Sequence, residues 1–408
     1  MRCRRSRLGR KDAFSSGRYA RAVSGYLALA FDMPKLIVVS IVSYMESGDT
    51  SVDAGRGRES PKRPLRVALV GCGRIGSFTR PELRRSLSPG WLPLNHAEAI
   101  GSTPGLQLDS ICDINAEHLE RARLTLNVPA YSDYYRQIAE TKPDIVSIAT
   151  RTNIRSKIID WSLTHGVRGI HCEKPISNNM GDCKKIISAI AERDTKLTYG
   201  TTRRFMDIFR LAHAMVRSGE IGKLVDVEVQ LGRTLLLWNH PHSVDLFLYF
   251  AGDVNVSRVQ GRCTFREAPQ NDLFIDDDPI VEEASVEFDT GVTGHLSSKS
   301  GINVILTGTS GVLRVGDDGR WLEIKKGNAF AKRVETNVSM SGTVRAFSEL
   351  ETAVRRGNAI SIQPHEIEVG MAILLSIAKS ALRDGDPVSP NMIEDNFSIT
   401  GRFGDNYA

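Results

Sequence analysis

The chain has 408 residues, of which 41% are hydrophobic, 25% charged and 7% aromatic. This composition excludes a collagen-like, coiled-coil or wholly disordered protein, and the length favours two domains. Residues 1–60 hold 11 basic and 6 acidic residues, which accounts for the whole net charge of +5. Because the remaining charges balance, we expect no nucleic-acid partner. No apolar run is long enough to predict a membrane span.

The six cysteines are scattered and form no C-x-x-C pair. This spacing indicates reduced thiols in a cytoplasmic protein, and it predicts neither a disulfide framework nor a metal site.

Residues 1–63 begin rich in arginine and continue as an apolar stretch that Asp32 and Pro34 interrupt. They resemble an organelle transit peptide or a signal sequence only in part. We interpret them as a disordered or mis-assigned N-terminal extension, with Met33 and Met45 as candidate starts. They take no part in the fold prediction.

Short apolar runs alternate with helical patterns over residues 64–200. Strands are expected at 65–70, 106–112, 145–149 and 169–172, and helices at 115–126, 134–140, 154–165 and 181–193. Strands and helices that alternate in this way form right-handed βαβ units. The pattern predicts an α/β Rossmann domain with a doubly wound parallel sheet.

Strand patterns without intervening helices dominate residues 201–408. After a helix at 206–218, strands are expected at 224–231, 256–264, 281–288, 292–298, 303–306 and 322–324, and two last helices at 343–355 and 364–382. This order predicts a second, α+β domain with a mostly antiparallel open sheet.

The motif Gly71-Cys72-Gly73-Arg74-Ile75-Gly76 directly follows the first predicted strand. In a G-x-G-x-x-G turn the first glycine permits a tight bend, the second lets backbone approach a pyrophosphate, and the third lets helix pack on strand. The phosphates lie at the N-terminus of the next helix. We therefore predict a dinucleotide site whose cofactor-binding residues include Gly71, Gly73, Arg74, Ile75 and Gly76.

An acidic residue is expected at the end of the second strand, where it would bind the adenosine ribose. Asp113 stands there, but 37 residues past Gly76. The extra length comes from residues 79–95, whose prolines exclude one continuous helix and indicate an insertion before helix resumes at 96–100. A carboxylate at Asp113 would repel a 2′-phosphate, so NAD is favoured over NADP. An N-cap role for Asp113 is compatible with this.

Further motifs lie at Glu173-Lys174-Pro175, at Arg203-Arg204-Phe205, over residues 242–252 and at the end, 380–388. Together with the glycine turn they resemble the Gfo/Idh/MocA oxidoreductases over about residues 65–390. The resemblance implies a nicotinamide-dependent dehydrogenase or reductase of a sugar, sugar derivative or cyclitol. It also implies a homo-oligomer, either a dimer or a tetramer, that forms through the C-terminal sheet. The C-terminal domain is expected to bind the substrate as well.

The resemblance implies two catalytic residues, Lys174 and His242. A lysine with a depressed pKa can exchange a proton with the substrate hydroxyl. The alternative is that Lys174 has no catalytic role and is a surface lysine at the end of a strand. Pro241 would place His242 in the first turn of a helix, where the dipole keeps imidazole neutral; the alternative is a histidine that only caps and packs. Glu173, Lys174, Thr150 and Asn153 are predicted to contact the cofactor.

Substrate contacts are predicted at Arg204, Trp238, Asn239, His240 and Asp245. Asp245 would orient His242, and Arg204 is as easily explained by an inter-domain ion pair. Relatives in this family often carry aspartate where Trp238 stands, so Asn239 or His240 would replace its hydrogen bonds. Trp238 would stack on a ring or lie in the core. Two other functions stay open: a glycoside hydrolase that uses bound NAD for transient oxidation, and a non-catalytic dinucleotide sensor.

Overall fold

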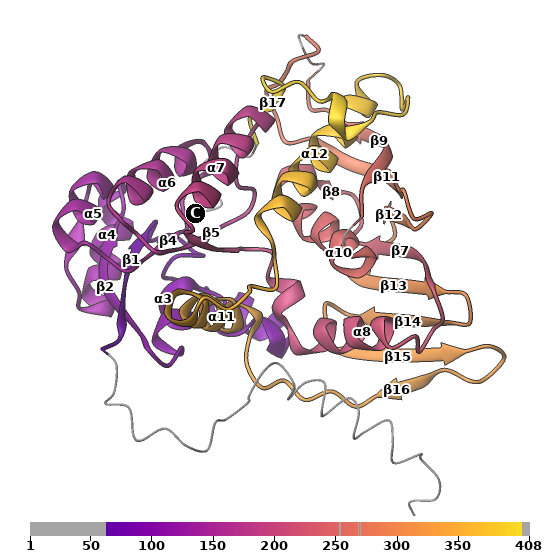
Figure 1. Cartoon of the computed structure of the whole chain (residues 1–408), viewed down its shortest axis with the longest axis horizontal. Helices are drawn as coiled ribbons and strands as arrows, with labels where there is room; N and C mark the ends of the chain where they lie inside the picture. Colours follow the sequence, from indigo (N-terminus) through magenta and orange to yellow (C-terminus); the bar gives the residue numbers. More distant parts are fainter. Residues whose placement is uncertain (1–62, 253, 268, 270, 402–408) are drawn as a thin grey trace, which may run out of the picture. The chain divides into compact units, whose positions relative to one another are not determined.

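The computed structural model describes residues 63–252, 254–267, 269 and 271–401 (Figure 1). The prediction for the N-terminal extension therefore falls almost wholly outside the described residues. No helix in the described part of the chain is long and apolar enough to cross a membrane.

The first sheet has six parallel strands in the order β3-β2-β1-β4-β5-β6. These strands are β1 (Leu65–Val70), β2 (Leu106–Cys112), β3 (Ala130–Tyr131), β4 (Ile145–Ile148), β5 (Gly169–Cys172) and β6 (Lys196–Tyr199). The crossover helices are α4 (Ala116–Leu126), α5 (Tyr134–Thr141), α6 (Arg155–Thr164) and α7 (Met180–Glu192). The predicted doubly wound sheet is confirmed, and its strand order reverses between β1 and β4, where such folds bind ligands.

The insertion after the glycine turn interrupts the first crossover helix. It contains α2 (Pro81–Ser86) and the 3₁₀ turn η1 (Pro89–Trp91), and α3 (His96–Gly101) follows. The His96 N–H donates to the Ile75 carbonyl at 2.8 Å, and the Ala97 N–H donates to the Gly76 carbonyl at 2.9 Å. These two bonds join α3 to the glycine turn, so residues 79–95 leave and re-enter at nearly the same point.

The second sheet has nine strands, and β7 lies between β13 and β12. The strands are β7 (Leu224–Gln230), β8 (Thr234–Leu235), β9 (Val256–Thr264), β11 (Ile280–Phe288), β12 (Thr293–Ser297), β13 (Asn303–Gly308), β14 (Gly311–Gly316), β15 (Trp321–Lys326) and β16 (Lys332–Val334). Every pair is antiparallel except β7 with β12, which confirms a mostly antiparallel sheet. A small parallel pair joins β10 (Phe274–Ile275) to β17 (Ser398–Ile399).

Helices from the second half of the chain reach both sheets. They are α8 (Asp207–Arg217), α9 (Leu236–Asn239), α10 (Pro241–Ala251), α11 (Gly342–Arg356) and α12 (Pro364–Ala381). Helix α11 lies beside α3 and packs on β5 and β6 of the first sheet (Figure 1). The Phe347 ring is 4.5 Å from that of His171, so the chain returns to the first sheet after building the second.

A buried ion-pair network ties η3 (Thr202–Phe205) to α10 and α12. The Arg204 side chain is 1% exposed, and it meets Asp245 at 2.8 Å and Glu366 at 3.2 Å. Burial raises the pKa of Asp245, which Arg204 opposes, and the balance leaves it at about 6. A buried pair of this kind is costly to break, because the remaining charge loses its partner.

We expect Arg204→Met to lower the free energy of unfolding by about 3–5 kcal/mol. The measurement is urea unfolding followed by circular dichroism. Arg210→Met is the matched control, because Arg210 is 35% exposed and its pair with Glu349 is worth about 1 kcal/mol or less. Equal losses in the two variants would show that the Arg204 network does not hold these helices together.

Candidate active site

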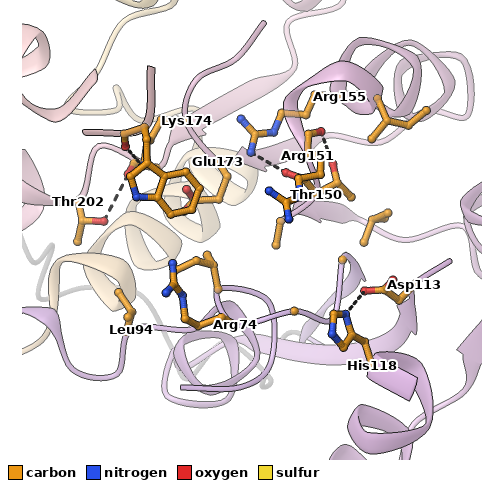
Figure 2. A pocket seen from close by; sticks show the side chains of 18 of the residues that line it. Arg74, Leu94, Asp113, His118, Thr150, Arg151, Arg155, Glu173, Lys174 and Thr202 are labelled. Atoms are coloured by element: carbon orange, nitrogen blue, oxygen red, sulfur yellow. Dashed lines mark hydrogen bonds and ion pairs between the residues drawn. The ribbon is translucent and has the colours of Figure 1, made fainter. Parts of the chain in front are cut away.

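A cavity of about 1140 Å³ opens at the carboxyl ends of β1, β2, β4 and β5 and extends to residues of the second half of the chain. Its volume exceeds the roughly 300–1,000 Å³ of most single-ligand pockets. Figure 2 shows Asp113 and His118 on one side of the view, Lys174 and Thr202 on the other, and Arg74 and Thr150 between. The predicted residues that line it are Gly71, Gly73, Arg74, Ile75, Asp113, Thr150, Asn153, Glu173, Lys174, Trp238, Asn239 and His242.

The three glycines of the turn have different surroundings. Gly71 has a φ of +100°, and a Cβ there would lie 2.7 Å from the Ala149 backbone. A Cβ on Gly76 would lie 1.9 Å from the Gly71 carbonyl oxygen, and Gly76 is absent from the cavity lining. A Cβ on Gly73 would meet nothing within 4 Å. Gly73 therefore leaves backbone open to the cavity, which suits a pyrophosphate.

The Asp113 carboxylate is fixed at the rim of this turn. It accepts the Cys72 N–H at 2.6 Å and the Asn115 N–H at 2.8 Å. The N-cap of α4 is Asn115, whose side chain accepts the His118 N–H, so Asp113 is not needed as the cap. His118 Nδ1 lies 4.0 Å from the Asp113 carboxylate, and the sequence analysis missed this imidazole. This position suits a carboxylate that accepts hydrogen bonds from ribose hydroxyls.

Lys174 reaches from the end of β5 to the cavity wall formed by α9. Its ammonium donates to the Trp238 carbonyl and lies 4.7 Å from the centre of the Trp238 ring. Desolvation lowers the pKa of Lys174 to about 8, although Glu173 and Asp278 raise it. A lysine in this state exchanges protons near neutral pH.

Asp278 was not predicted from the sequence, and it holds the turn that faces Lys174. Its carboxylate accepts the Leu237 N–H at 2.7 Å and the Trp238 N–H at 3.0 Å, at the start of α9. Burial raises the pKa of Asp278 to about 6, while these two N–H groups and Lys174 lower it. Asp278 thus holds the backbone N–H of Trp238, the residue whose carbonyl accepts the Lys174 ammonium.

Glu173 contacts His96, which is the third residue, after His118 and Asp278, that the sequence patterns did not predict. His96 Nε2 lies 3.3 Å from the Glu173 carboxylate, and its Nδ1 lies 2.8 Å from the Ser147 hydroxyl. Burial raises the pKa of Glu173, but the bond to His96 and the charge of Lys174 bring it to about 2. His96, His171 and Glu173 each offer one atom of a metal-ligating type, and these three atoms lie within 4.8 Å of one another. His171 Nδ1 contacts the Thr198 hydroxyl.

Arg155 joins the two loops that carry Thr150 and Lys174. Its guanidinium donates to the Thr150 carbonyl at 2.6 Å and also to the Pro175 carbonyl. The side chain is buried, so it holds both loop ends at the cavity (Figure 2). The sequence held one signal for this role. Arg155 stands at the first position of α6, where capping does not require an arginine.

His242 lies in the first turn of α10, after Pro241, and its ring meets the Trp91 ring edge-on at 5.8 Å. Burial, and then the charges of Lys174 and Arg203, lower the pKa of His242 well below its ordinary value. Its Nδ1 has no hydrogen-bond partner among the described residues. The imidazole is therefore neutral, and His242 lines the cavity.

Of the remaining predicted substrate contacts, only Asn239 lines the cavity. Arg204 and Asp245 bond each other, and neither they nor His240 line the cavity. His240 contacts the Ser243 hydroxyl at 3.2 Å. Asn239 lines the cavity, and its side-chain oxygen accepts the Thr234 hydroxyl at 2.6 Å. Asp245 is thus engaged by Arg204 and does not orient His242.

Comparisons with known proteins agree with the sequence motifs and the fold. Residues 65–201 match the model of the GFO_IDH_MocA oxidoreductase family, NAD-binding Rossmann fold. A myo-inositol 2-dehydrogenase from Thermotoga maritima is 28% identical over 160 residues, which is 39% of this chain and 42% of that protein. The chain thus matches less than half the length of this relative.

Solved structures with the same fold cover most of the chain. An oxidoreductase from Agrobacterium radiobacter, in complex with NAD+, L-tartaric acid and magnesium, has a TM-score of 0.64 over 80% of this chain and 98% of its own, at 18% identity. An aldose-aldose oxidoreductase from Caulobacter crescentus, complexed with glycerol, has a TM-score of 0.67 over 80% of this chain and 100% of its own, also at 18% identity. Over residues 65–201 the chain is thus identified with the Gfo/Idh/MocA oxidoreductase family by the model of its NAD-binding Rossmann fold.

Proposed function

We propose that this protein is an NAD-dependent dehydrogenase or reductase that transfers a hydride between nicotinamide and a hydroxyl or keto carbon of a sugar, sugar derivative or cyclitol. The observation that carries the proposal is Lys174, whose pKa of about 8 suits proton exchange, beside neutral His242 in the cavity that begins at the glycine turn. The inositol 2-dehydrogenase relatives support a polyol substrate.

The cofactor would occupy the part of the cavity next to the glycine turn. Gly71, Gly73 and Ile75 would hold the pyrophosphate, and Asp113 the adenosine ribose. Thr150, Asn153 and Glu173 line the path between these residues and Lys174. Bound NAD supplies the hydride acceptor in the oxidation and, as NADH, the hydride donor in the reduction.

Lys174 supplies the proton chemistry. In the oxidation its neutral amine would take the proton of the substrate hydroxyl, while the carbon that bears this hydroxyl gives its hydride to the nicotinamide. In the reduction the Lys174 ammonium would return the proton to that oxygen. The Trp238 carbonyl and the charge of Asp278 stabilise the ammonium between these steps. His242, which is neutral and lines the same cavity, would bond a substrate oxygen and orient the reacting carbon.

We also propose a cytoplasmic homo-oligomer. All five cysteines in the described part of the chain are free, which fits a reducing compartment. Strands β7, β9, β11 and β12 carry a shallow polar pocket that includes Asp226, Arg262, Glu283 and His295. Paired charges of both signs on one sheet face suit a symmetric interface with a second copy.

We expect Lys174→Ala to lower kcat roughly a hundredfold to ten-thousandfold, because the proton acceptor is lost. NADH binding, measured by fluorescence titration, should persist. Lys184→Ala is the control, since this lysine lies on α7, pairs with Asp395 and is 48% exposed. Turnover equal to that of the unchanged protein would remove Lys174 from the mechanism.

We expect Asp278→Asn to move the pH dependence of alcohol oxidation toward lower pH. Oxidation needs the neutral amine, so kcat/KM rises as pH passes the pKa of Lys174, about 8. Asp278 stabilises the ammonium, and its neutralisation lowers that pKa further. Asp276→Asn is the control, because Asp276 is exposed and its carboxylate accepts the Thr400 hydroxyl at 3.0 Å. An unmoved profile in Asp278→Asn would mean that this carboxylate does not act on the proton acceptor.

We expect the protein to use NAD in preference to NADP, and Asp113→Ser to reduce that preference at least about tenfold by removing a like-charge contact with the 2′-phosphate. The measurement is kcat/KM with each cofactor. Asp109→Ser, on the same strand, should leave the ratio unchanged. A strong preference of the unchanged protein for NADP would place Asp113 away from the ribose.

A further inference from the structure

One part of the cavity lining is apolar, and the proposed chemistry with a polyol does not account for it. Its side chains come from the insertion and from the ends of two strands of the second sheet. This apolar subsite consists of Leu83, Leu87, Trp91, Leu231 and Ile302.

The insertion supplies one wall of the apolar subsite. Leu83 lies in α2, and Leu87 is the extended residue that ends this helix, where its N–H donates to the Leu83 carbonyl at 3.1 Å. The flanking residues attach this segment to the turn between β14 and β15. The Ser88 hydroxyl donates to the Asp318 carbonyl at 2.7 Å, and Arg320 donates to the Ser86 carbonyl at 2.6 Å. Residues 79–95 are thus fixed against the second sheet.

Trp91 connects this wall to the proposed catalytic centre. Its indole N–H donates to the Asp318 carboxylate at 2.9 Å, and Arg203 lies over its ring and pairs with the same carboxylate. The Trp91 ring meets His242 at 5.8 Å. The apolar subsite therefore borders the imidazole that would bind a substrate oxygen.

Ile302 and Leu231 form the opposite wall. They are the residues next to the pair Gln230–Asn303, which joins the ends of β7 and β13. Ile302 is 40% exposed and has a φ of +47°, a conformation that β-branched residues rarely adopt. Its carbonyl accepts the Asp318 N–H at 2.9 Å, close to the anchor of Trp91. Strain at a cavity wall is typical of a position kept for function.

We propose that the apolar subsite binds an alkyl or aryl substituent of the substrate, so that the substrate is a substituted sugar or cyclitol such as a glycoside with an apolar aglycone. This inference rests on the proposed function and names its substrate class. A bare polyol offers hydroxyls to every wall and leaves Leu83, Leu87 and Ile302 facing water. An apolar substituent removes these side chains from water, a gain in free energy that a bare polyol does not provide.

The test compares phenyl β-glucoside with methyl β-glucoside, which present the same ring hydroxyls. We expect kcat/KM, followed by NADH formation, to be about tenfold or more higher for the phenyl compound. Ile302→Asn should bring the ratio toward one, because asparagine tolerates the positive φ but makes the wall polar. Phe330→Asn, at a 95% exposed position outside the cavity, should leave the ratio unchanged.

The outcomes separate this inference from the proposed function. Equal or better use of the methyl compound overturns the apolar subsite and leaves the dehydrogenase intact. If neither glycoside is oxidised, calorimetric titration of the NAD-loaded protein decides, and equal or undetectable binding of the two compounds overturns the inference. Failure to bind NAD, or to oxidise any polyol or glycoside, counts against the proposed function itself.

Discussion

The Lys174 ammonium lies in a buried wall of the cavity, where a charge without a fixed partner is unfavourable. Desolvation favours the neutral amine, whereas the Trp238 carbonyl and the nearby carboxylates favour the charged form. Desolvation is the larger effect, and the resulting pKa of about 8 leaves both protonation states of Lys174 accessible close to neutral pH. The rest of the site preserves this balance. Asp278 fixes the turn that carries Trp238, and His96 holds the Glu173 carboxylate to one side.

These contacts explain why two sheets are needed. Lys174 ends a strand of the first sheet, whereas Trp238 and His242 belong to short helices beside the second. Helix α11 packs on the first sheet, and the Arg204 network ties η3 to α10 and α12. The lysine and its acceptor carbonyl are thus held by separate parts of one packed body.

Most of the fold was accessible from local patterns. Strands such as β1 and β5 are contiguous buried runs, so their ends in the structure match the predicted ends. Strand β6 contains Lys196 and Thr198, which interrupt its apolar pattern, and β14 lies between glycines that suggest turns, so neither strand was predicted. The parallel pairing of β7 with β12 depends on a neighbour far along the chain, which a local pattern does not encode.

The site divides in the same way. Gly71, Asp113 and Lys174 belong to motifs that are contiguous in the sequence, and all of them line the cavity. Asp278 lies in an acidic stretch that looks like a surface loop, and its role comes from backbone groups about forty residues away. Arg204 and Asp245 sit in motif positions, but each satisfies the other, which residue type alone does not show.

The interrupted helix after the glycine turn has a consequence for how this protein can change. Both ends of residues 79–95 meet at the bonds from His96 to Ile75 and from Ala97 to Gly76. The segment between them can lengthen, shorten or alter its side chains while the backbone beside the phosphates stays in place. Selection for a new substrate can therefore act on residues 79–95 alone, without disturbing the residues that bind the dinucleotide.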